Sequence, residues 1–323
     1  MVDEQNTGST LNVNNINGDD EETTRRKQTE HQLQSIQDEI RGTQSLTSEL
    51  LPLSCLTASY NEGMGEEKTA QPTTSLMFRG ESQQLESKYR FFRKVRGDGN
   101  CYYRAFLYAV CESVLLLLDS SPSGGGEEET KNKDEVCEGV EELNRLIELA
   151  KNSIDLVAQR GYDRSTIEMF HEELVDLFTS LSPPSSSDSS PPQLNQSTLH
   201  STLNEENAMS DYCTWYLRLL TACHLKSDPD RFIYFLDVDD GQYPGGMDIP
   251  TFCSREVEPM GRECGMVQVL ALAEVMGVRV VIEYMDGRGG SGGGLVCHEF
   301  GKEDAKMTIF LLYRPGHYDI LYK

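Results

Sequence analysis

A short glycine-rich segment ends in a cysteine that could act as a nucleophile. The segment is Gly97-Asp98-Gly99-Asn100-Cys101, and a helical pattern of apolar residues begins directly after it. A cysteine in the first turn of a helix lies at the positive end of the helix dipole, close to amides without a partner inside the helix. Both effects favour the thiolate, which is the form that attacks carbonyl carbons. The alternative is a turn that ends in a small buried cysteine.

The same loop offers a place for the negative charge that forms when a thiolate attacks a carbonyl. Glycines on both sides of Asp98 leave the backbone amides accessible, and amides aimed at a developing oxyanion stabilise it. A nucleophilic cysteine also needs a general base within reach. Histidine is the usual base at neutral pH, and the chain has six histidines, at positions 31, 171, 200, 224, 298 and 317.

His317 is the best candidate for this base. It lies in Pro315-Gly316-His317-Tyr318-Asp319, between two segments with the composition of strands. Residues two apart in an extended strand point to the same side, so His317 and Asp319 are expected to project together. The carboxylate would then orient the imidazole and stabilise its charged form. The alternative is a hairpin edge whose polar side chains face water.

The other histidines have more ordinary interpretations. His31 and His200 are expected to be solvated, because they lie near the N-terminal tail and beside a serine–proline insert. His171 and His224 fall in helical patterns, where packing or capping accounts for them. His298 follows a glycine-rich turn, and its role stays open.

Helices must position the nucleophile, and the sequence predicts several. After Cys101 an apolar residue recurs about every 3.6 residues, which is typical of a helix with one buried face. The residues in this pattern are Phe106, Val110, Val114 and Leu117. Similar patterns predict further helices over residues 140–157, 165–181, 206–224 and 267–276.

The base requires a strand, and the strand signals lie in the C-terminal third. Residues 279–284 are β-branched and short, and residues 308–313 and 318–322 are two more strand candidates. Helical patterns dominate the N-terminal half. The sequence therefore predicts an α+β fold, with helices packed on a mostly antiparallel sheet.

The chain divides into a tail, residues 1–50, and one catalytic domain, residues 51–323. Residues 1–28 are polar and acidic, which predicts disorder, whereas the apolar spacing over residues 30–41 predicts one amphipathic helix. That helix would dock on its own domain or on a partner. The domain carries low-complexity inserts near residues 119–135, 182–199 and 287–294. Residues 61–74 are expected to be irregular, with the compact part beginning near Ser87.

Composition excludes several classes of function. The 323 residues include 29 basic and 53 acidic side chains, for a formal net charge of −24. Nucleic acids and anionic membranes are polyanions that need a basic surface, so neither is the expected partner. No run reaches the roughly 18 apolar residues that span a bilayer, and the first residues lack the apolar stretch of a secretory signal.

The cysteines are expected to be reduced intracellular thiols. There are nine, an odd number, and they are scattered without close pairs. Cys253, Cys264, Cys297 and His298 are the residues that would have to form a zinc site, and their spacing is not that of zinc ligands. The cysteines in helical apolar patterns are predicted core residues: Cys111, Cys213 and Cys223.

Several long motifs together resemble one known family. Residues 97–106, Gly-Asp-Gly-Asn-Cys-Tyr-Tyr-Arg-Ala-Phe, resemble the nucleophile motif of ovarian-tumour-domain (OTU) cysteine proteases. Residues 311–322, Leu-Leu-Tyr-Arg-Pro-Gly-His-Tyr-Asp-Ile-Leu-Tyr, resemble the histidine motif of the otubain branch. Other otubain-like segments follow in the right order: residues 52–56, 216–221, 255–260 and 283–286. The similarity runs from about residue 50 to residue 323.

The resemblance implies a papain-like OTU fold and hydrolysis of ubiquitin conjugates. Carried over position by position, Cys101 would be the nucleophile, His317 the general base and Asp319 the residue that orients it. Asp98 belongs to the loop whose backbone amide, with that of Cys101, would form the oxyanion hole. The reaction would cleave the isopeptide bond between the C-terminal glycine of ubiquitin and a lysine. It would pass through a thioester acyl-enzyme and need no metal or organic cofactor.

The resemblance also implies the partners. The substrates would be ubiquitin and polyubiquitin conjugates, with a preference for lysine-48-linked chains. Ubiquitin-conjugating enzymes are a second class of partner, because some otubains restrain these enzymes without cutting anything, partly through an N-terminal segment. We expect a monomer in the cytoplasm, with the nucleus as a further location.

Two other functions fit parts of the sequence. The first is a non-catalytic regulator that binds ubiquitin or its conjugating enzyme; the presence of Cys101, His317 and Asp319 favours the enzyme over it. The second is cysteine-based transfer chemistry on another acyl donor, which the three residues alone would allow.

The sequence departs from the family in three places. Family members tend to carry an acidic residue and two histidines where this chain has Cys264-Gly265-Met266-Val267-Gln268. If that surface lies near the cleft, substrate placement or linkage preference would differ. The inserts are expected to expand surface loops and leave the core intact. Tyr102 and Tyr103 replace the Phe-Tyr or Phe-Phe of the family, which is a mild change.

Overall fold

The computed structural model describes residues 32, 35–36, 38–62, 72–119, 133–183, 193–236, 246–287 and 294–323. The central parts of the predicted inserts, the predicted loop at residues 237–245 and the tail at residues 1–31 lie outside the described residues. The chain divides into two compact units, Met1–Gln44 and Ser45–Lys323. In the first unit residues 38–43 are helical, within and just beyond the C-terminal end of the predicted amphipathic helix.

A mixed six-stranded sheet lies at the centre of the second unit. Its strands, within the described ranges, are β1 (Leu51–Pro52), β2 (Phe91–Arg93), β3 (Arg279–Tyr284), β4 (Val296–Phe300), β5 (Thr308–Arg314) and β6 (His317–Tyr322). Their order is β1-β2-β6-β5-β3-β4, and neighbours pair antiparallel except for β3 and β5. The predicted α+β class with a mostly antiparallel sheet is confirmed.

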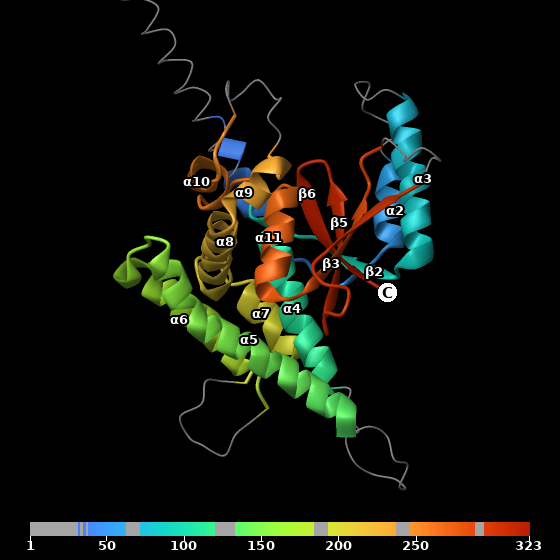
Figure 1. Ribbon diagram of the computed structural model, residues 1–323. Helices are drawn as coiled ribbons and strands as arrows, with labels where there is room; N and C mark the ends of the chain where they lie inside the picture. The colour runs from blue at the N-terminus through green and yellow to red at the C-terminus, as the bar shows by residue number, and fades with distance from the viewer. Residues whose placement is uncertain are drawn as a thin grey trace, which may run out of the picture. The chain divides into compact units, whose positions relative to one another are not determined.

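Helices supply most of the remaining structure. They are α2 (Ser54–Glu62), α3 (Pro72–Lys88), α4 (Cys101–Asp119), α5 (Lys133–Gln159), α6 (Arg164–Ser180), α7 (Gln196–Leu203), α8 (Met209–Ser227), α9 (Pro229–Phe232), α10 (Ile249–Phe252) and α11 (Met266–Met276). Short helical turns at Ile233–Phe235 and Cys253–Val257 follow α9 and α10. In Figure 1, α4 and α11 lie along one side of the sheet and α2 and α3 along the other.

The alternation of side chains in β5 explains why the sheet is covered on both faces. Ile309 and Leu311 are buried in the large cluster formed with α4 and α11. Phe310 and Leu312 point the other way, into a smaller cluster with α2 and α3. A strand that is apolar on both faces needs both faces packed, and the helix pair α2–α3 covers the second one.

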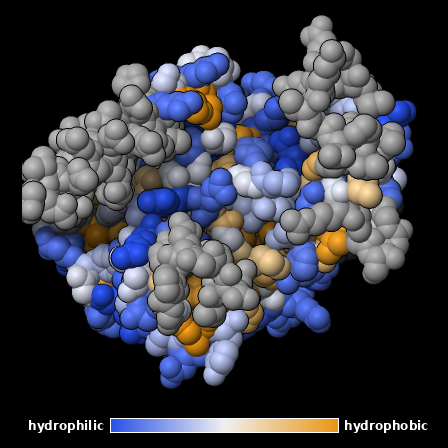
Figure 2. All heavy atoms as spheres, turned by 90° about the horizontal axis from the view of Figure 1, so that it is seen from above, coloured by the Kyte–Doolittle hydropathy of each residue, from blue (hydrophilic) through white to orange (hydrophobic). Residues whose placement is uncertain are grey.

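Helix α4 is the main core helix and begins at the candidate nucleophile. Its buried side chains run from Cys101 to Leu115. Among the described residues it is the helix long and apolar enough to cross a membrane, but 72% of its apolar window is buried inside the protein. Core packing therefore accounts for its apolar character. Figure 2 shows one face of the molecule as mostly hydrophilic, with apolar side chains in small separate patches.

Three local predictions were wrong. Helix α3 starts at residue 72, so ordered structure begins well before Ser87; its sequence is polar, and burial of Leu85 against the sheet holds it in place. Helix α7 begins within the range assigned to the second insert, where Asn195 and Thr198 form a capping box, and continues to Leu203. Strand β4 was not predicted, because as an edge strand it is largely exposed and its composition is mixed.

Candidate active site

The nucleophile lies where the chain leaves the sheet and enters the core. Strand β2 leads to Val95, which bridges to Thr47, and the glycine-rich loop then ends at Cys101 as the first residue of α4. The carbonyl of Asn100 accepts the amide of Arg104 at 3.0 Å, which closes the first turn of the helix. Cys101 is therefore placed at the positive end of the helix dipole.

The structure brings Cys101, His317 and Asp319 together. Nε2 of His317 lies 2.9 Å from Oδ1 of Asp319, on the same side of β6, as the strand alternation predicts. The Cys101 side chain is within hydrogen-bonding reach of His317. Because Nε2 faces the carboxylate, Nδ1 is the ring nitrogen left to face the thiol. A Cβ added to Gly97 would lie 3.6 Å from that nitrogen, which places the loop directly beside the ring.

The electrostatics of the pair favour a charged imidazole. Burial lowers the pKa of His317, but hydrogen bonds to Asp319 and Cys101 and the charges of these groups outweigh it, raising the pKa from 6.5 to about 9. Asp319 is fully buried, which raises its pKa, yet the bond from His317 and the charge of Arg314 hold that pKa below its ordinary value. A carboxylate that stays ionised can stabilise an imidazolium next to it.

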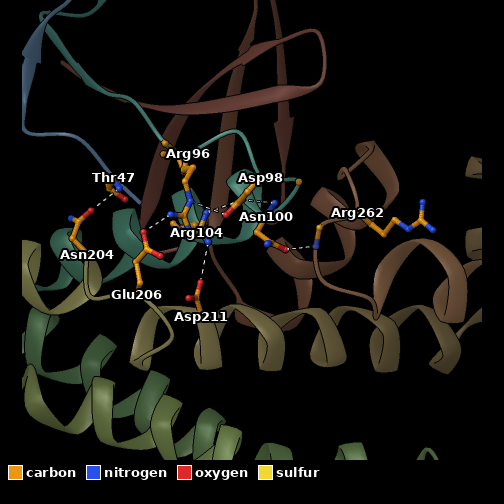
Figure 3. A network of polar contacts seen from close by, with 12 residues as sticks. Thr47, Arg96, Asp98, Asn100, Arg104, Asn204, Glu206, Asp211 and Arg262 are labelled. Carbon is orange, nitrogen blue, oxygen red and sulfur yellow. Dashed lines mark hydrogen bonds and ion pairs between the residues drawn. The ribbon is translucent and has the colours of Figure 1, made fainter. Parts of the chain in front are cut away.

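Asp98 holds the nucleophile loop through its side chain. Its Oδ1 accepts the amide of Asn100 at 3.0 Å and Nη1 of Arg104 at 2.9 Å, while Oδ2 accepts Nε of Arg96 at 3.2 Å. Figure 3 shows the two arginines converging on this carboxylate, with Glu206 and Asp211 beyond them. Burial opposes ionisation of Asp98, but these contacts keep its pKa low. The prediction concerned the backbone amide of this loop; the structure adds a carboxylate that fixes the loop.

A third buried arginine joins the loop to the segment on the opposite side of the site. Arg218 of α8 is fully buried, and its Nη2 donates to the carbonyls of Gly99 and Arg262 at 2.7 Å and to Oδ1 of Asn100 at 2.9 Å. Its guanidinium also lies over the ring of Tyr103, 4.5 Å from the centroid. The segment that follows Pro259 is thereby held against the nucleophile loop.

Two glycines allow these two sides of the site to touch. Gly99 has φ +76°, and a Cβ there would lie 2.2 Å from the carbonyl oxygen of Gly261. Gly261 has φ +79°, and its amide donates to Oδ1 of Asn100 at 2.9 Å. Any side chain at residue 99 would push the two sides apart, because both the left-handed backbone and the close approach require glycine.

The other buried cysteines are placed for packing. Burial raises the pKa of each of these thiols, to about 12 for Cys223 and Cys253 and in the same direction for Cys111, Cys213 and Cys264. They therefore stay protonated at neutral pH and are poor nucleophiles.

The remaining described histidines have structural partners. His171 contacts the carbonyl of Ala150 at 2.9 Å, and His224 contacts Glu274 at 2.9 Å, in keeping with a packing role. The solvated state predicted for His200 was wrong, because its ring packs against Tyr108 and lies 3.2 Å from that hydroxyl. His298 lies on β4 and packs against a tyrosine ring. Within the described ranges no cluster of side chains is suited to a metal ion.

The segment in which the sequence departs from the family lies beside the site. The carbonyl of Cys264 accepts the hydroxyl of Tyr318 at 3.2 Å, which places it next to His317 in the fold. The side chain of Gln268 accepts the amide of Gly265 at 3.0 Å and so caps α11, while Met266 is exposed. This surface therefore lies near the site, which is the condition under which the departure would alter substrate placement or linkage preference.

The sequence reasoning missed four arginines at the site: Arg96, Arg104, Arg218 and Arg314. An isolated arginine in a helix or strand usually lies in water, so its type alone gives no signal. For two of them the sequence did hold a signal. Arg104 and Arg218 fall on the apolar faces of their helices, where an unpaired charge is not tolerated.

Comparison with known proteins shows the family of the chain. Residues 39–323 match the family described as Peptidase C65 Otubain. The chain is 35% identical over 289 residues to human ubiquitin thioesterase OTUB1, covering 89% of this chain and 87% of the relative. It is 30% identical over 246 residues to human ubiquitin thioesterase OTUB2, covering 76% and 87% respectively.

Solved structures show the same fold. The h/ceOTUB1 chain in a complex with ubiquitin aldehyde and UBCH5B~Ub superimposes with a TM-score of 0.67 at 25% identity, over 93% of this chain and 99% of that chain. The corresponding complex with UBC13~Ub gives a TM-score of 0.68. The match to the family covers well over half of the sequence and includes both motifs of the site. The chain therefore belongs to the otubain family of cysteine peptidases.

Proposed function

We propose that this otubain is a deubiquitinating thiol protease that hydrolyses isopeptide bonds of ubiquitin conjugates through Cys101, His317 and Asp319. The observation that carries the proposal is the imidazole of His317, held by a buried carboxylate on one side with the Cys101 thiol in reach on the other. The curated relatives are ubiquitin thioesterases, which indicates ubiquitin as the acyl group.

The geometry supports a definite sequence of proton transfers. Nδ1 of His317 takes the proton of Cys101, and the thiolate attacks the carbonyl carbon of the ubiquitin C-terminal glycine. The backbone amides of Cys101 and of the loop at Asp98 stabilise the oxyanion that forms. The imidazolium then gives its proton to the leaving lysine amine, which leaves a thioester on Cys101.

Water completes the reaction by the reverse route. His317 removes a proton from a water molecule that attacks the thioester, and the sulfur leaves as the free carboxylate of ubiquitin is released. Asp319 does not change its own protonation in these steps. It keeps Nε2 of His317 protonated and the ring in one orientation, as its short contact requires.

A cleavage assay tests the proposal. Lysine-48- and lysine-63-linked di-ubiquitin are incubated with the wild-type chain, with Cys101→Ser and with His317→Gln. We expect wild type to release mono-ubiquitin, faster from the lysine-48 linkage, and both variants to release none. Cleavage by Cys101→Ser, or none by wild type on a full panel of linkages, would refute the proposal. Equal rates on both linkages would remove only the linkage preference.

We also propose that the chain binds ubiquitin-conjugating enzymes. The observation in favour is that the superimposable h/ceOTUB1 complexes contain UBCH5B~Ub and UBC13~Ub. The Cys101→Ser variant is used for the test, because it separates binding from hydrolysis. We expect it to slow the discharge of ubiquitin from such an enzyme. No retardation, together with no association in sedimentation, would contradict this second role.

A further inference from the structure

Arg314 stands on the far side of the Asp319 carboxylate from His317. Its Nη2 lies 2.5 Å from Oδ2 of Asp319, while Oδ1 of the same carboxylate accepts His317 Nε2 at 2.9 Å and the amide of Val95 at 3.0 Å. The Asp319 side chain has no exposed surface, whereas that of Arg314 is 27% exposed. Each oxygen of a buried carboxylate is thus bound by a donor from a different segment.

The hairpin of β5 and β6 places the arginine there. Arg314 pairs with His317 in the register of the two strands, and Leu312 pairs with Asp319. Because alternate residues share a face, Arg314 and Asp319 lie on the side of the sheet that α2 and α3 cover. The hydroxyl of Tyr60 of α2 lies within hydrogen-bonding reach of Arg314, and its ring stacks on Phe78 of α3, with ring centroids 5.6 Å apart.

We propose that Arg314, anchored by Tyr60, is a positioning residue that fixes Asp319 in the orientation needed to hold His317. The contacts form one continuous line, from the α2–α3 helix pair through Tyr60, Arg314 and Asp319 to the imidazole. The helix pair is thereby connected to the site, although it contributes none of the three proposed catalytic side chains.

Loss of the arginine would free the carboxylate to move. Oδ2 would be left as a buried charged oxygen without its donor, and such an oxygen rotates towards another partner or takes up a proton. Rotation breaks the contact with His317, and protonation removes the negative charge that stabilises the imidazolium. The other groups that face this site are Cys101 and, beside Gly316, the carboxylate of Glu263, 3.1 Å from where a Cβ on that glycine would lie.

The direction of a pH shift separates positioning from simple charge. If Arg314 acted only as a nearby cation, removing it would strengthen the hold of Asp319 on a proton at His317, and the upper limb of the pH–rate profile would move to higher pH. If Arg314 positions Asp319, loss of Arg314 weakens the stabilisation of protonated His317 by Asp319. The upper limb of the pH–rate profile then moves to lower pH. The two roles therefore predict opposite signs.

The experiment compares four full-length chains: wild type, Arg314→Gln, Tyr60→Phe and Arg145→Gln. The last is a matched control, because Arg145 also pairs a partly exposed guanidinium with a buried carboxylate, Glu142, but does so on α5. Hydrolysis of a fluorogenic ubiquitin amide and alkylation of Cys101 by iodoacetamide are both measured as functions of pH, and folding is followed by circular dichroism.

We expect Arg314→Gln to lower kcat/KM by about tenfold to a hundredfold, which corresponds to the loss of one charge-assisted hydrogen bond. The upper limb of its pH–rate profile should shift to lower pH. Tyr60→Phe keeps the ring and the cation, and should produce the same change at about threefold to tenfold. Arg145→Gln should match wild type. An upper limb that stays in place or rises in Arg314→Gln overturns the proposal, as does wild-type behaviour of Tyr60→Phe.

Two features keep the test decisive. The activity readout rests on the proposed hydrolase function, but alkylation needs no ubiquitin, so a wild-type chain that cleaves nothing would refute that function while the alkylation profiles still decide the role of Arg314. If Arg314→Gln fails to fold, Tyr60→Phe carries the test, because it removes a single hydroxyl from a partly exposed residue.

Discussion

The contact between Asp319 and His317 makes the stability of the protein depend on pH in a calculable way. The pKa of His317 is raised from 6.5 in the unfolded chain to about 9 in the folded one. Since a tenfold change in an equilibrium corresponds to about 1.4 kcal/mol, protonated His317 contributes about 3 kcal/mol to folding. That contribution is fully present below pH 6.5, declines between pH 6.5 and 9, and is lost above pH 9.

The Asp319→Asn variant tests this contribution of protonated His317 to the free energy of folding. The bond and charge of Asp319 raise the pKa of His317, with Cys101 supplying the rest, so the variant loses most of the effect. We expect Asp319→Asn to be less stable than wild type at pH 6.5, and this difference to shrink by about 2 kcal/mol at pH 9.5. Asp319 and Arg314 keep their charges across this range, because the pKa of the first is lowered and that of the second raised.

The assay is urea unfolding at several pH values, followed by the fluorescence of Trp215, the single tryptophan of the chain. Glu142→Gln serves as the control, because it also removes a buried carboxylate from an arginine, without a histidine in the pair. The difference in free energy of unfolding between Glu142→Gln and wild type should stay constant with pH. A difference between Asp319→Asn and wild type that is constant, or that grows, from pH 6.5 to 9.5 would refute the reasoning.

Three further predictions concern the parts that hold the site. Gly99→Ala should cost more than about 1 kcal/mol of stability and most of the activity, whereas Gly161→Ala, also at positive φ but facing open space, should keep its activity. Activity equal to wild type in Gly99→Ala would show that the two sides of the site move apart freely. Arg104→Met leaves Asp98 without its closest cation, so a lowered urea midpoint and a slower Cys101 alkylation are expected; an unchanged midpoint contradicts the bracing role. Residues 1–44 form a separate compact unit, so their deletion should leave the circular dichroism spectrum per residue and the cleavage of a minimal ubiquitin substrate intact. Insoluble protein after the deletion would count against a unit boundary at residue 44.

The local periodicity of the sequence was sufficient to assign each residue of the proposed triad to its helix or strand. The 3.6-residue pattern after Cys101 indicates the helix that it begins, and the two-residue period of a strand puts His317 and Asp319 on one side. What joins these segments, over two hundred residues apart, is long-range packing, which no local pattern contains. The resemblance to a family supplied that step.

The supporting residues could not be predicted for the same reason. Arg314 carries no sign of its partner, because the partner is defined by the register of β5 with β6. The sequence of helix α3 is polar and does not show an apolar helical pattern. The helix is held by packing against the second face of the sheet. Asp98 was predicted for its backbone, whereas its carboxylate has the larger observed part in holding the loop.

The place of β6 in the sheet has a consequence for biosynthesis. This strand is the last in sequence order, yet it lies in the interior of the sheet, between β2 and β5, and carries His317 and Asp319. A nascent chain that has not reached these residues has a gap in its sheet as well as no base beside its thiol. Because domains fold as units during synthesis, peptidase activity would be switched on only when translation has passed residue 319 and this strand has been inserted. A growing polypeptide on the ribosome thus contains the Cys101 thiol long before His317 and Asp319 are present to activate it.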